Sequence, residues 1–315
     1  MVKKIAFVFP GQGSQSVGMG KDLYENFEAA KNVFDTADKV LGKSITTICF
    51  EGPEDDLKLT VNTQPSIVTM SIAALESFKS ELDVEVSATA GHSLGEYCAM
   101  YASGVMDLET TLKAIQKRAD LMGATKGGAM AAILNAPEGS LEKALEEASS
   151  VGYVDVANYN SPAQVVITGD EVAVAKAGEL LSAAGARRVV PLAVSGAFHS
   201  KFMENAGKEF AGFVSELDLN DASIPVFTNV DAQATVLGAE FKNKMPKQIY
   251  SSVQWTQSVQ KMVAEGIDTF VEIGPGKVLA GLVKKIDASV NVYNVYDKAS
   301  LEATVTSLKE EMAAV

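Results

Sequence analysis

The sequence predicts an α/β fold with a mainly parallel sheet. Short apolar runs alternate along most of the chain with longer segments in which apolar residues recur at helical spacing. Strands that alternate with helices in this way are typical of βαβ units, whose strands run parallel to one another. The middle of the chain has a different order of elements, which indicates a second, smaller sheet.

Outside the middle of the chain, strands are predicted at residues 5–9, 86–90, 226–229, 269–273 and 292–295. Helices are predicted there at residues 22–41, 65–81, 96–104, 108–122, 201–217, 258–265 and 301–312. Leu108, Leu112 and Ile115 illustrate the helical pattern, because their spacing places them on one face of a helix. We expect such faces to pack against the sheet.

The middle segment predicts, in order, a strand at 129–134, a helix at 140–149, strands at 153–157 and 164–168, a helix at 172–184 and a strand at 188–194. The order βαββαβ is that of a ferredoxin-like unit. Glycines flank this segment at 127–128 and at 196. We therefore expect a large α/β-hydrolase-like domain of residues 1–126 and 197–315, with a ferredoxin-like small subdomain of residues 127–196 inserted into it.

Composition excludes several classes of function. The chain has 315 residues, of which 47% are hydrophobic, so it can bury a large core. The net charge of −13 argues against binding to nucleic acids and to anionic membranes. No apolar stretch approaches the ~20 residues of a membrane span, and the run at residues 5–9 is too short for a signal peptide.

The sequence also predicts no metal ion and no cofactor. Cys49, Cys98 and the two histidines have no metal-binding spacing, so we expect free thiols and a cytoplasmic location. The stretch Gly11-Gln12-Gly13 follows the first strand, as in dinucleotide-binding proteins. The third glycine of that motif is replaced by Ser16, and we therefore reject a dinucleotide site.

The most informative motif is Gly91-His92-Ser93-Leu94-Gly95, which lies where the strand at 86–90 meets the helix at 96–104. This is the setting of a nucleophile elbow. Such a turn exposes the Ser93 hydroxyl and leaves the backbone amide of Leu94 at a helix N-terminus, where it could bind an oxyanion. We interpret Ser93 as the nucleophile. The alternative is that Ser93 only caps the helix.

A serine nucleophile needs a base within about 3 Å, and the chain contains only two histidines. His92 is next to Ser93 along the backbone, where adjacent side chains diverge. His199 lies between an apolar run and the helix at 201–217, a junction at which α/β enzymes build their sites. His199 is therefore the predicted base. The junction carries no Asp or Glu, so we expect a backbone carbonyl to orient the ring.

Arg118 is a candidate for binding an anion. It shares one face of the helix at 108–122 with Ile115 and Met122. An arginine at the edge of an apolar face is costly to bury unless an anion meets it, and its planar fork suits a carboxylate. An alternative is equally well supported by the residues alone: the aliphatic part of the Arg118 side chain packs against the apolar face while its guanidinium group reaches water.

Five motifs are spread over nearly the whole chain. They are Phe9-Pro10-Gly11-Gln12-Gly13-Ser14-Gln15, Gly91-His92-Ser93-Leu94-Gly95-Glu96, Asn160-Ser161-Pro162, Val253-Gln254-Trp255-Thr256 and Glu272-Ile273-Gly274-Pro275-Gly276-Lys277. Each motif alone is a weak signal, but together and in this order they are specific. They resemble the malonyl-CoA:acyl carrier protein transacylase family of fatty acid synthesis.

The resemblance implies a ping-pong reaction. Ser93 would take malonyl from malonyl-CoA and pass it to the phosphopantetheine thiol of acyl carrier protein. The backbone amides of Gln12 and Leu94 would form the oxyanion hole. The main-chain carbonyl of Gln254 would orient His199, which fits the missing acid.

Three further residues are expected to bind the substrate. By the resemblance, Arg118 would hold the malonyl carboxylate, and Asn160 lies in one of the shared motifs. Phe198, next to His199, resembles the malonyl-selective Ala-Phe-His pattern of related acyltransferase domains. Its ring would narrow the pocket where an α-methyl branch would lie.

Acyl carrier proteins are acidic and so is this chain, so docking should depend on a local basic patch. The candidates are Arg187, Arg188, Lys277, Lys284 and Lys285. We expect the protein to be a monomer.

Two alternative functions remain open from the residues. A serine hydrolase would use the same elbow, although the missing acid near His199 and the presence of Arg118 count against it. A non-catalytic carrier-binding module would be favoured by loss of the nucleophile or the base, and both are present here.

Overall fold

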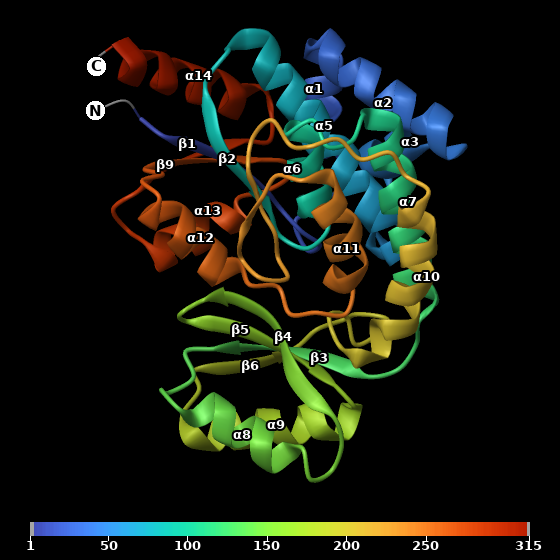
Figure 1. Ribbon diagram of the computed structural model, residues 1–315, viewed down its shortest axis with the longest axis vertical. Helices are drawn as coiled ribbons and strands as arrows, with labels where there is room; N and C mark the ends of the chain where they lie inside the picture. Colours follow the sequence, from blue (N-terminus) through green and yellow to red (C-terminus); the bar gives the residue numbers. More distant parts are fainter. Residues whose placement is uncertain (1–2, 314–315) are drawn as a thin grey trace.

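The computed structural model describes residues 3–313 and has a mixed α/β architecture with two separate sheets (Figure 1). The large sheet has the strand order β10-β9-β1-β2-β7-β8. Neighbouring strands run parallel except for β7 and β8, so the predicted mainly parallel sheet is confirmed. The strands are β1 (Ile5–Phe9), β2 (Val86–Gly91), β7 (Val226–Phe227), β8 (Ala234–Thr235), β9 (Thr269–Ile273) and β10 (Asn291–Val295).

Helices cover both faces of the large sheet, because successive residues of its buried strands point to opposite sides. Ala6 and Val8 of β1 pack with the helices α12 (Trp255–Ala264) and α13 (Val278–Ile286). Ile5, Phe7 and Phe9 belong to the larger core on the other face. The helices of that face are α1 (Lys21–Asn26), α2 (Glu28–Leu41), α3 (Ile45–Glu51), α4 (Glu54–Lys58), α5 (Thr60–Glu81), α6 (Gly95–Ala102), α7 (Leu108–Ala124), α10 (Glu204–Ser215), α11 (Gly238–Gln248) and α14 (Lys298–Ala313).

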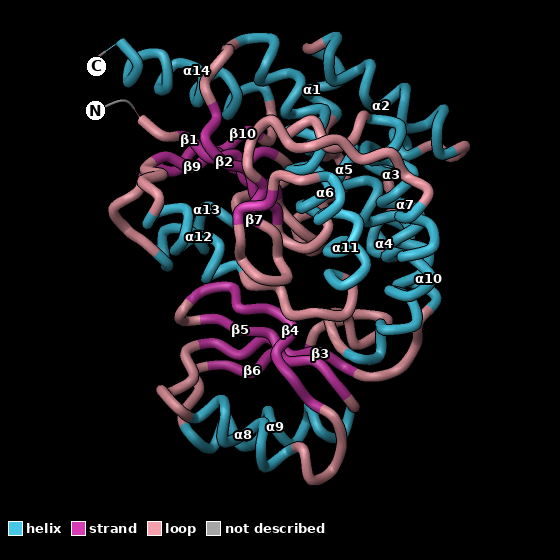
Figure 2. The backbone as a smooth tube through the Cα atoms, in the orientation of Figure 1, coloured by secondary structure: helices cyan, strands magenta, loops and turns pink. Residues whose placement is uncertain are grey.

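The smaller sheet and its two helices form what we call the small module. It contains β3 (Ala129–Leu134), β4 (Val154–Ser161), β5 (Gln164–Gly169), β6 (Arg188–Pro191), α8 (Ser140–Ala148) and α9 (Glu171–Ala184). The strand order is β4-β5-β3-β6, and all neighbours are antiparallel. One face of this sheet is directed toward the rest of the chain, while α8 and α9 lie on its outer face (Figure 2).

Most predicted elements are present with shifted ends, and the predicted order βαββαβ in the middle of the chain is confirmed. The predicted helix at 22–41 is wrong in one respect, because Phe27 adopts an extended conformation and separates α1 from α2. The predicted helix at 201–217 begins with a 3₁₀ turn, Lys201–Met203, before α10. The last strand of the small module ends at Pro191 rather than at residue 194.

Helix α5 begins at Thr60, five residues before the predicted start at Pro65. A proline inside a helix leaves the carbonyl four residues earlier without its amide partner. Here that carbonyl belongs to Val61, and it accepts hydrogen bonds from Gln116 Nε2 at 3.3 Å and Lys43 Nζ at 2.9 Å. Side chains distant in sequence thus satisfy the group that the proline leaves free, and the helix continues through it.

The sequence did not predict α3, α4, α11, α13 or the short strand β8. Helix α11 has a polar sequence with Pro246 in its last turn, so its apolar periodicity is weak. Within residues 3–313, no helix combines the length and the apolar character needed to cross a membrane.

Candidate active site

Ser93 lies in the turn between β2 and α6, at the carboxyl end of a central strand of the large sheet. Its φ angle of 51° places it in the left-handed region, which is strained for a residue other than glycine. The carboxyl ends of parallel strands are where α/β proteins build their sites. The strand, turn and helix predicted around Ser93 are confirmed.

The two glycines that flank Ser93 are required by close packing. A Cβ atom on Gly91 would lie 1.9 Å from the backbone carbon of Gly95. A Cβ atom on Gly95 would lie 2.2 Å from the carbonyl oxygen of Phe9 in the neighbouring strand. Any larger residue would open the turn and move the Ser93 hydroxyl.

Ser93 and His199, 106 positions apart in the sequence, form a hydrogen bond of 2.8 Å between Oγ and Nε2. His199 also has a positive φ, 55°, and is buried. Its Nδ1 donates to the backbone carbonyl oxygens of Gln248 at 2.9 Å and Ser251 at 3.1 Å. With its proton on Nδ1, the ring leaves Nε2 free to accept the Ser93 proton.

The prediction that Gln254 orients His199 is wrong in its residue, although a backbone carbonyl does take the place of an acid. The carbonyl of Gln254 accepts hydrogen bonds from both the backbone amide and the hydroxyl of Ser258, each 2.9 Å long. Both of these hydrogen bonds lie within the first turn of α12. The carbonyls of Gln248 and Ser251, at and just beyond the end of α11, face the imidazole instead.

Burial, together with the nearby charge of Arg118, lowers the pKa of His199 to about 3. The imidazole is therefore neutral at physiological pH. A neutral imidazole that accepts the serine proton is the form that a general base requires.

Arg118 is fully buried, so the structure decides against the alternative of a solvated head group. Its Nη2 donates to Ser93 Oγ at 3.1 Å, and its Nη1 donates to Gln64 Oε1 at 2.7 Å. Nε and Nη2 also donate to Gln248 Oε1 at 3.2 and 3.0 Å. All these acceptors are uncharged. Among residues 3–313 no carboxylate lies within ion-pair distance of Arg118, so this buried cation lacks a counter-ion.

Sequence reasoning missed three polar residues that support the site, Gln64, Gln248 and Asn229. The Nε2 of Gln248 donates to the Ser93 carbonyl at 2.7 Å and to Asn229 Oδ1 at 3.2 Å. Asn229 Oδ1 accepts the Ser93 amide at 2.8 Å, and its Nδ2 donates to the Gly91 carbonyl at 2.7 Å. These side chains hold the turn from distant parts of the chain. No local pattern in the sequence marks them.

Glu96 also supports the turn, through its contact with Asn229. Its Oε2 accepts the backbone amide of Asn229 at 2.6 Å. Burial raises the pKa of the Glu96 carboxyl to about 7. The hydrogen bond from the Asn229 amide and the nearby charge of Arg118 oppose this rise.

Gln12 and Leu94 follow the adjacent strands β1 and β2, as an oxyanion hole would require. In the described part of the chain, neither backbone amide donates a recorded hydrogen bond. Gln12 also lines the cavity beside Ser93. Two amides without a partner at the end of a sheet can bind a developing negative charge.

A cavity of about 110 Å³, which we call the acyl cavity, opens beside Ser93 and His199. Phe198 lines it, together with Gln64 and with apolar side chains of the small module and of the rest of the chain. A second cavity of about 230 Å³, the middle cavity, shares Gln12 and His92 with it. Asn160 lines the middle cavity, and its Oδ1 accepts a hydrogen bond of 2.7 Å from Nε2 of His92. Substrate-binding roles for Phe198 and Asn160 remain predictions.

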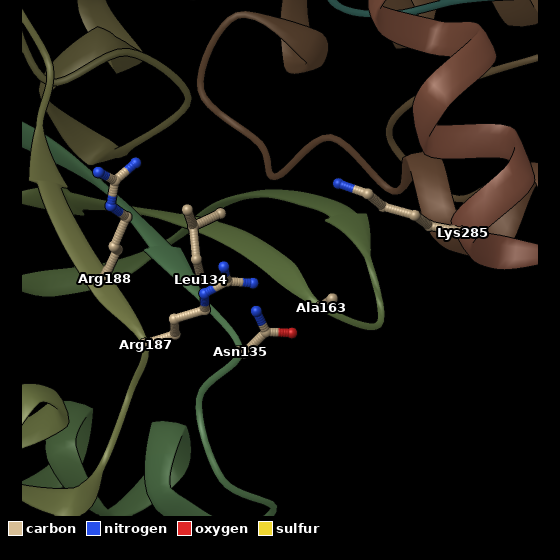
Figure 3. Close-up of a pocket in the computed structure, with 6 residues that line it drawn as sticks. All are labelled: Leu134, Asn135, Ala163, Arg187, Arg188 and Lys285. Atoms are coloured by element: carbon tan, nitrogen blue, oxygen red, sulfur yellow. The ribbon is translucent and has the colours of Figure 1, made fainter.

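The five predicted docking cations are not equivalent. Arg187, Arg188 and Lys285 line one cavity of about 440 Å³, which we call the cationic cavity (Figure 3). Lys277 lies over the ring of Tyr296, 4.8 Å from its centroid. Lys284 donates to the backbone carbonyls of Ala288 and Val290 beyond the end of α13.

Comparisons with known proteins agree with this geometry. A family model described as an acyl transferase domain matches residues 6–311. The malonyl CoA-acyl carrier protein transacylase of Bacillus subtilis is 43% identical over 314 residues, which cover 98% of this chain and 99% of that protein. The transacylase of the same name from Escherichia coli K12 is 37% identical over 305 residues, covering 96% and 99%.

Solved structures have the same fold. An acyl carrier protein S-malonyltransferase from Vibrio cholerae superposes with a TM-score of 0.92 at 40% identity, covering 96% of this chain and 100% of that one. A malonyl-transacylase in complex with a type II PKS acyl-carrier protein gives a TM-score of 0.93 at 35% identity, covering 97% and 100%.

Proposed function

Because the chain belongs to the acyl transferase family, and within it to the malonyl-CoA:acyl carrier protein transacylases, we propose that it transfers malonyl from malonyl-CoA to the phosphopantetheine thiol of an acyl carrier protein. The transfer passes through a malonyl-Ser93 ester and supplies extender units for fatty acid synthesis. The geometry around Ser93 supports each half of the reaction.

In the first half, Ser93 Oγ attacks the thioester carbonyl of malonyl-CoA, and its proton passes to Nε2 of His199. The carbonyl oxygen gains the negative charge, for which the amides of Gln12 and Leu94 are the proposed donors. The intermediate collapses as the carbon–sulfur bond breaks. The thiolate of CoA takes the proton from His199, which leaves the malonyl ester and a neutral imidazole.

In the second half, Nε2 of His199 accepts the proton of the carrier thiol. The resulting thiolate attacks the ester carbonyl of malonyl-Ser93 to form a second tetrahedral intermediate. The bond between the carbonyl carbon and Ser93 Oγ then breaks. His199 returns its proton to Oγ, and the free enzyme is restored.

The observation that carries the malonyl assignment is the buried guanidinium of Arg118, 3.1 Å from the nucleophile and without a counter-ion among residues 3–313. A buried cation is stabilised when a substrate anion pairs with it. The free carboxylate of malonyl supplies that anion, whereas acetyl does not. The planar fork of arginine can bind it through two parallel hydrogen bonds.

Intact-protein mass spectrometry tests this proposal. We expect malonyl-CoA to add one malonyl group to the protein, and acetyl-CoA and methylmalonyl-CoA to add their groups far more slowly. Addition of a holo-acyl carrier protein should remove the malonyl group and place it on the carrier thiol. Retention of acetyl in preference to malonyl would contradict the assignment.

We also propose that the small module is a ferredoxin-like subdomain of residues 127–196, inserted into an α/β-hydrolase-like domain of residues 1–126 and 197–315. The strand order β4-β5-β3-β6 supports this, as does an isolated bridge between Gly127 and Gly196 that brings the two ends of the segment together. Limited proteolysis should cut first near these two glycines.

A cytoplasmic location and a monomeric state remain predictions. Cys49 and Cys98 are free and buried, which fits the first of them. Sedimentation equilibrium would measure the second.

A further inference from the structure

The backbone segment that carries His199 lies against the residues that lead into strand β3. The amide of Ala197 donates to the carbonyl of Gly127 at 3.2 Å. A Cβ atom on Gly128 would lie 2.6 Å from the Cβ atom of Ala197, so no side chain fits between the two segments. The position of His199 is therefore tied to that of the small module.

Thr168 of β5 contacts the peptide group that joins Phe198 to His199. Its Oγ1 donates a hydrogen bond of 3.0 Å to the carbonyl of Phe198, and both residues are buried. Within residues 3–313 this is the one recorded hydrogen bond to that peptide group. His199 has a φ angle of 55°, a strained conformation that persists only when the surrounding structure holds it. Thr168 supplies one of the contacts that hold it.

The alternation of side chains along β5 directs Thr168 toward the active site. Ile167 belongs to the core beneath α8 and α9. Val166 and Thr168, on either side of it, therefore point to the opposite face of the sheet. Val166 lines the middle cavity on that face. The Thr168 hydroxyl thus projects from the face of the small sheet that borders the site.

Strand β4 supports the imidazole from a second direction. It lies at one edge of the small sheet, and the segment after Ser251 pairs with this edge. Val253 forms a parallel bridge with Asn158, in which its amide and carbonyl make hydrogen bonds of 2.8 and 2.9 Å to β4. The hydroxyl of Ser252 donates to the carbonyl of Val156 at 2.6 Å. These contacts fix the residues directly after Ser251, whose carbonyl accepts the Nδ1 proton of the imidazole.

The two sets of contacts come from one rigid unit, because β4 and β5 are neighbours in the same antiparallel sheet. One set fixes the backbone of His199, and the other fixes an acceptor of its Nδ1 proton. We propose that the small module positions the base, with Thr168 and Ser252 as positioning residues that keep Nε2 of His199 directed at Ser93. The proposal rests on the proposed function, because it assumes that His199 activates Ser93.

The test compares variants that change one hydroxyl. Thr168→Val keeps the β-branched shape that suits a strand, but it leaves the Phe198 carbonyl without its donor. Thr168→Ser keeps a hydroxyl, and Ser252→Ala removes only the side-chain contact with β4. Thr304→Val is the matched control. Thr304 is also buried and donates to a backbone carbonyl, that of Asn294, at 2.8 Å, but it belongs to α14, far from the small module (Figure 1).

Two single-turnover reactions of Ser93 are followed by intact mass. The first is acylation by malonyl-CoA. The second is phosphonylation by a fluorophosphonate, in which the Ser93 oxygen bonds to phosphorus, fluoride leaves and the Ser93 proton passes to the base. This second reaction needs activation of the serine but no recognition of malonyl.

Thr168→Val should lower the maximal rate of both reactions by about 10- to 100-fold, because a small displacement of a base costs rate. The half-saturating concentration of malonyl-CoA should stay unchanged. Thr168→Ser should recover most of the rate. Ser252→Ala should lose less than Thr168→Val, since the backbone hydrogen bonds of Val253 remain, and Thr304→Val should react as the wild type.

A double-mutant cycle with His199→Ala separates positioning from general support of the fold. A residue that acts through the imidazole has no effect once the imidazole is removed. Thr168→Val/His199→Ala should therefore react at the rate of His199→Ala alone. Circular dichroism checks that each variant is folded.

Two results would overturn the positioning role: a wild-type rate in folded Thr168→Val, or an equal loss with and without His199. If Thr168→Val does not fold, the cycle is measured with Ser252→Ala, and an equal loss there has the same meaning. A wild type that is phosphonylated at Ser93 but takes no malonyl would overturn the proposed function alone. A wild type that forms neither adduct would overturn both.

Discussion

The guanidinium of Arg118 donates a hydrogen bond to the hydroxyl of Ser93 over 3.1 Å, so a buried cation touches the proposed nucleophile of this protein. The same hydroxyl bonds to His199 on its other side. One oxygen thereby meets the base that would remove its proton and the cation that would bind the far end of the acyl group. The proposed base and the proposed carboxylate-binding cation therefore both contact the Ser93 hydroxyl.

Ser93→Ala should abolish the covalent malonyl adduct, because the alanine has no oxygen to acylate. His199→Ala should slow formation of the adduct by about 10²–10⁴-fold, which is the usual contribution of a general base. Both rates can be followed by intact mass, with circular dichroism as the check on folding. A malonyl adduct that still forms on the Ser93→Ala protein would remove Ser93 as the nucleophile.

Arg118→Ala should lower kcat/KM for malonyl-CoA steeply and leave acetyl-CoA unharmed or improved. Loss of one partner from a desolvated charge pair costs roughly 2 to 5 kcal/mol, and only malonyl has the carboxylate. Arg118→Lys should recover part of the loss, because it keeps the charge without the fork. If malonyl and acetyl transfer fall by the same factor in Arg118→Ala, the arginine holds the turn rather than the substrate.

Phe198→Ser should admit methylmalonyl-CoA, because the aromatic ring lines the acyl cavity beside His199. A methyl group in a pocket is worth only about 1 to 3 kcal/mol, so the gain should be about 10- to 200-fold in relative kcat/KM. The competing rates of malonyl-CoA and methylmalonyl-CoA measure it. Unchanged selectivity in a folded variant would place the α-methyl group elsewhere in the cavity.

In a Glu96→Gln variant, the rate of Ser93 acylation should stay nearly constant between pH 8 and pH 5. This variant is used because the Glu96 carboxyl, with a pKa of about 7, would itself titrate in that range. The pKa of His199 lies at about 3, so the imidazole remains neutral throughout this range, and kcat/KM reports the free enzyme. A histidine with an ordinary pKa near 6.5 would be mostly protonated at pH 5 and would lose about 30-fold in rate. Stopped-flow measurement of CoA release gives the profile. A decline of that size centred near pH 6.5 would show that burial does not hold the imidazole neutral.

Gln248→Leu should slow malonyl transfer more than acetyl transfer, although Gln248 is a positioning residue that does not touch the acyl carbon. Its side chain bonds to Arg118 and to the Ser93 carbonyl, and leucine makes neither contact. The backbone carbonyl that orients His199 is retained. Gln254→Leu is the matched control and should leave both rates unchanged, because within residues 3–313 Gln254 forms hydrogen bonds only through its backbone, with Asn229 and Ser258.

The sequence by itself determined the mixed α/β fold class and the strand–turn–helix setting of Ser93, the proposed nucleophile. The elbow at Ser93 depends on a strand, two glycines and a helix that are contiguous, and close packing of Gly91 and Gly95 leaves no other residue possible there. His199 followed by elimination, since the chain has only one other histidine. These predictions could be made from the sequence because backbone geometry and apolar periodicity are set by neighbouring residues.

Tertiary structure alone decided which distant groups meet at Ser93. The sequence was equally compatible with a buried and a solvated guanidinium of Arg118, and the packing of α7 shows that it is buried. Gln248 and Asn229 lie 155 and 136 positions from Ser93, and no local pattern marks them as its partners. Gln254 was expected to orient His199 because of the family resemblance. The packing of α11 and α12 brings the carbonyls of Gln248 and Ser251 to the imidazole instead. Which groups form a hydrogen bond depends on where they lie in space, whereas the sequence gives only the order of the residues along the chain.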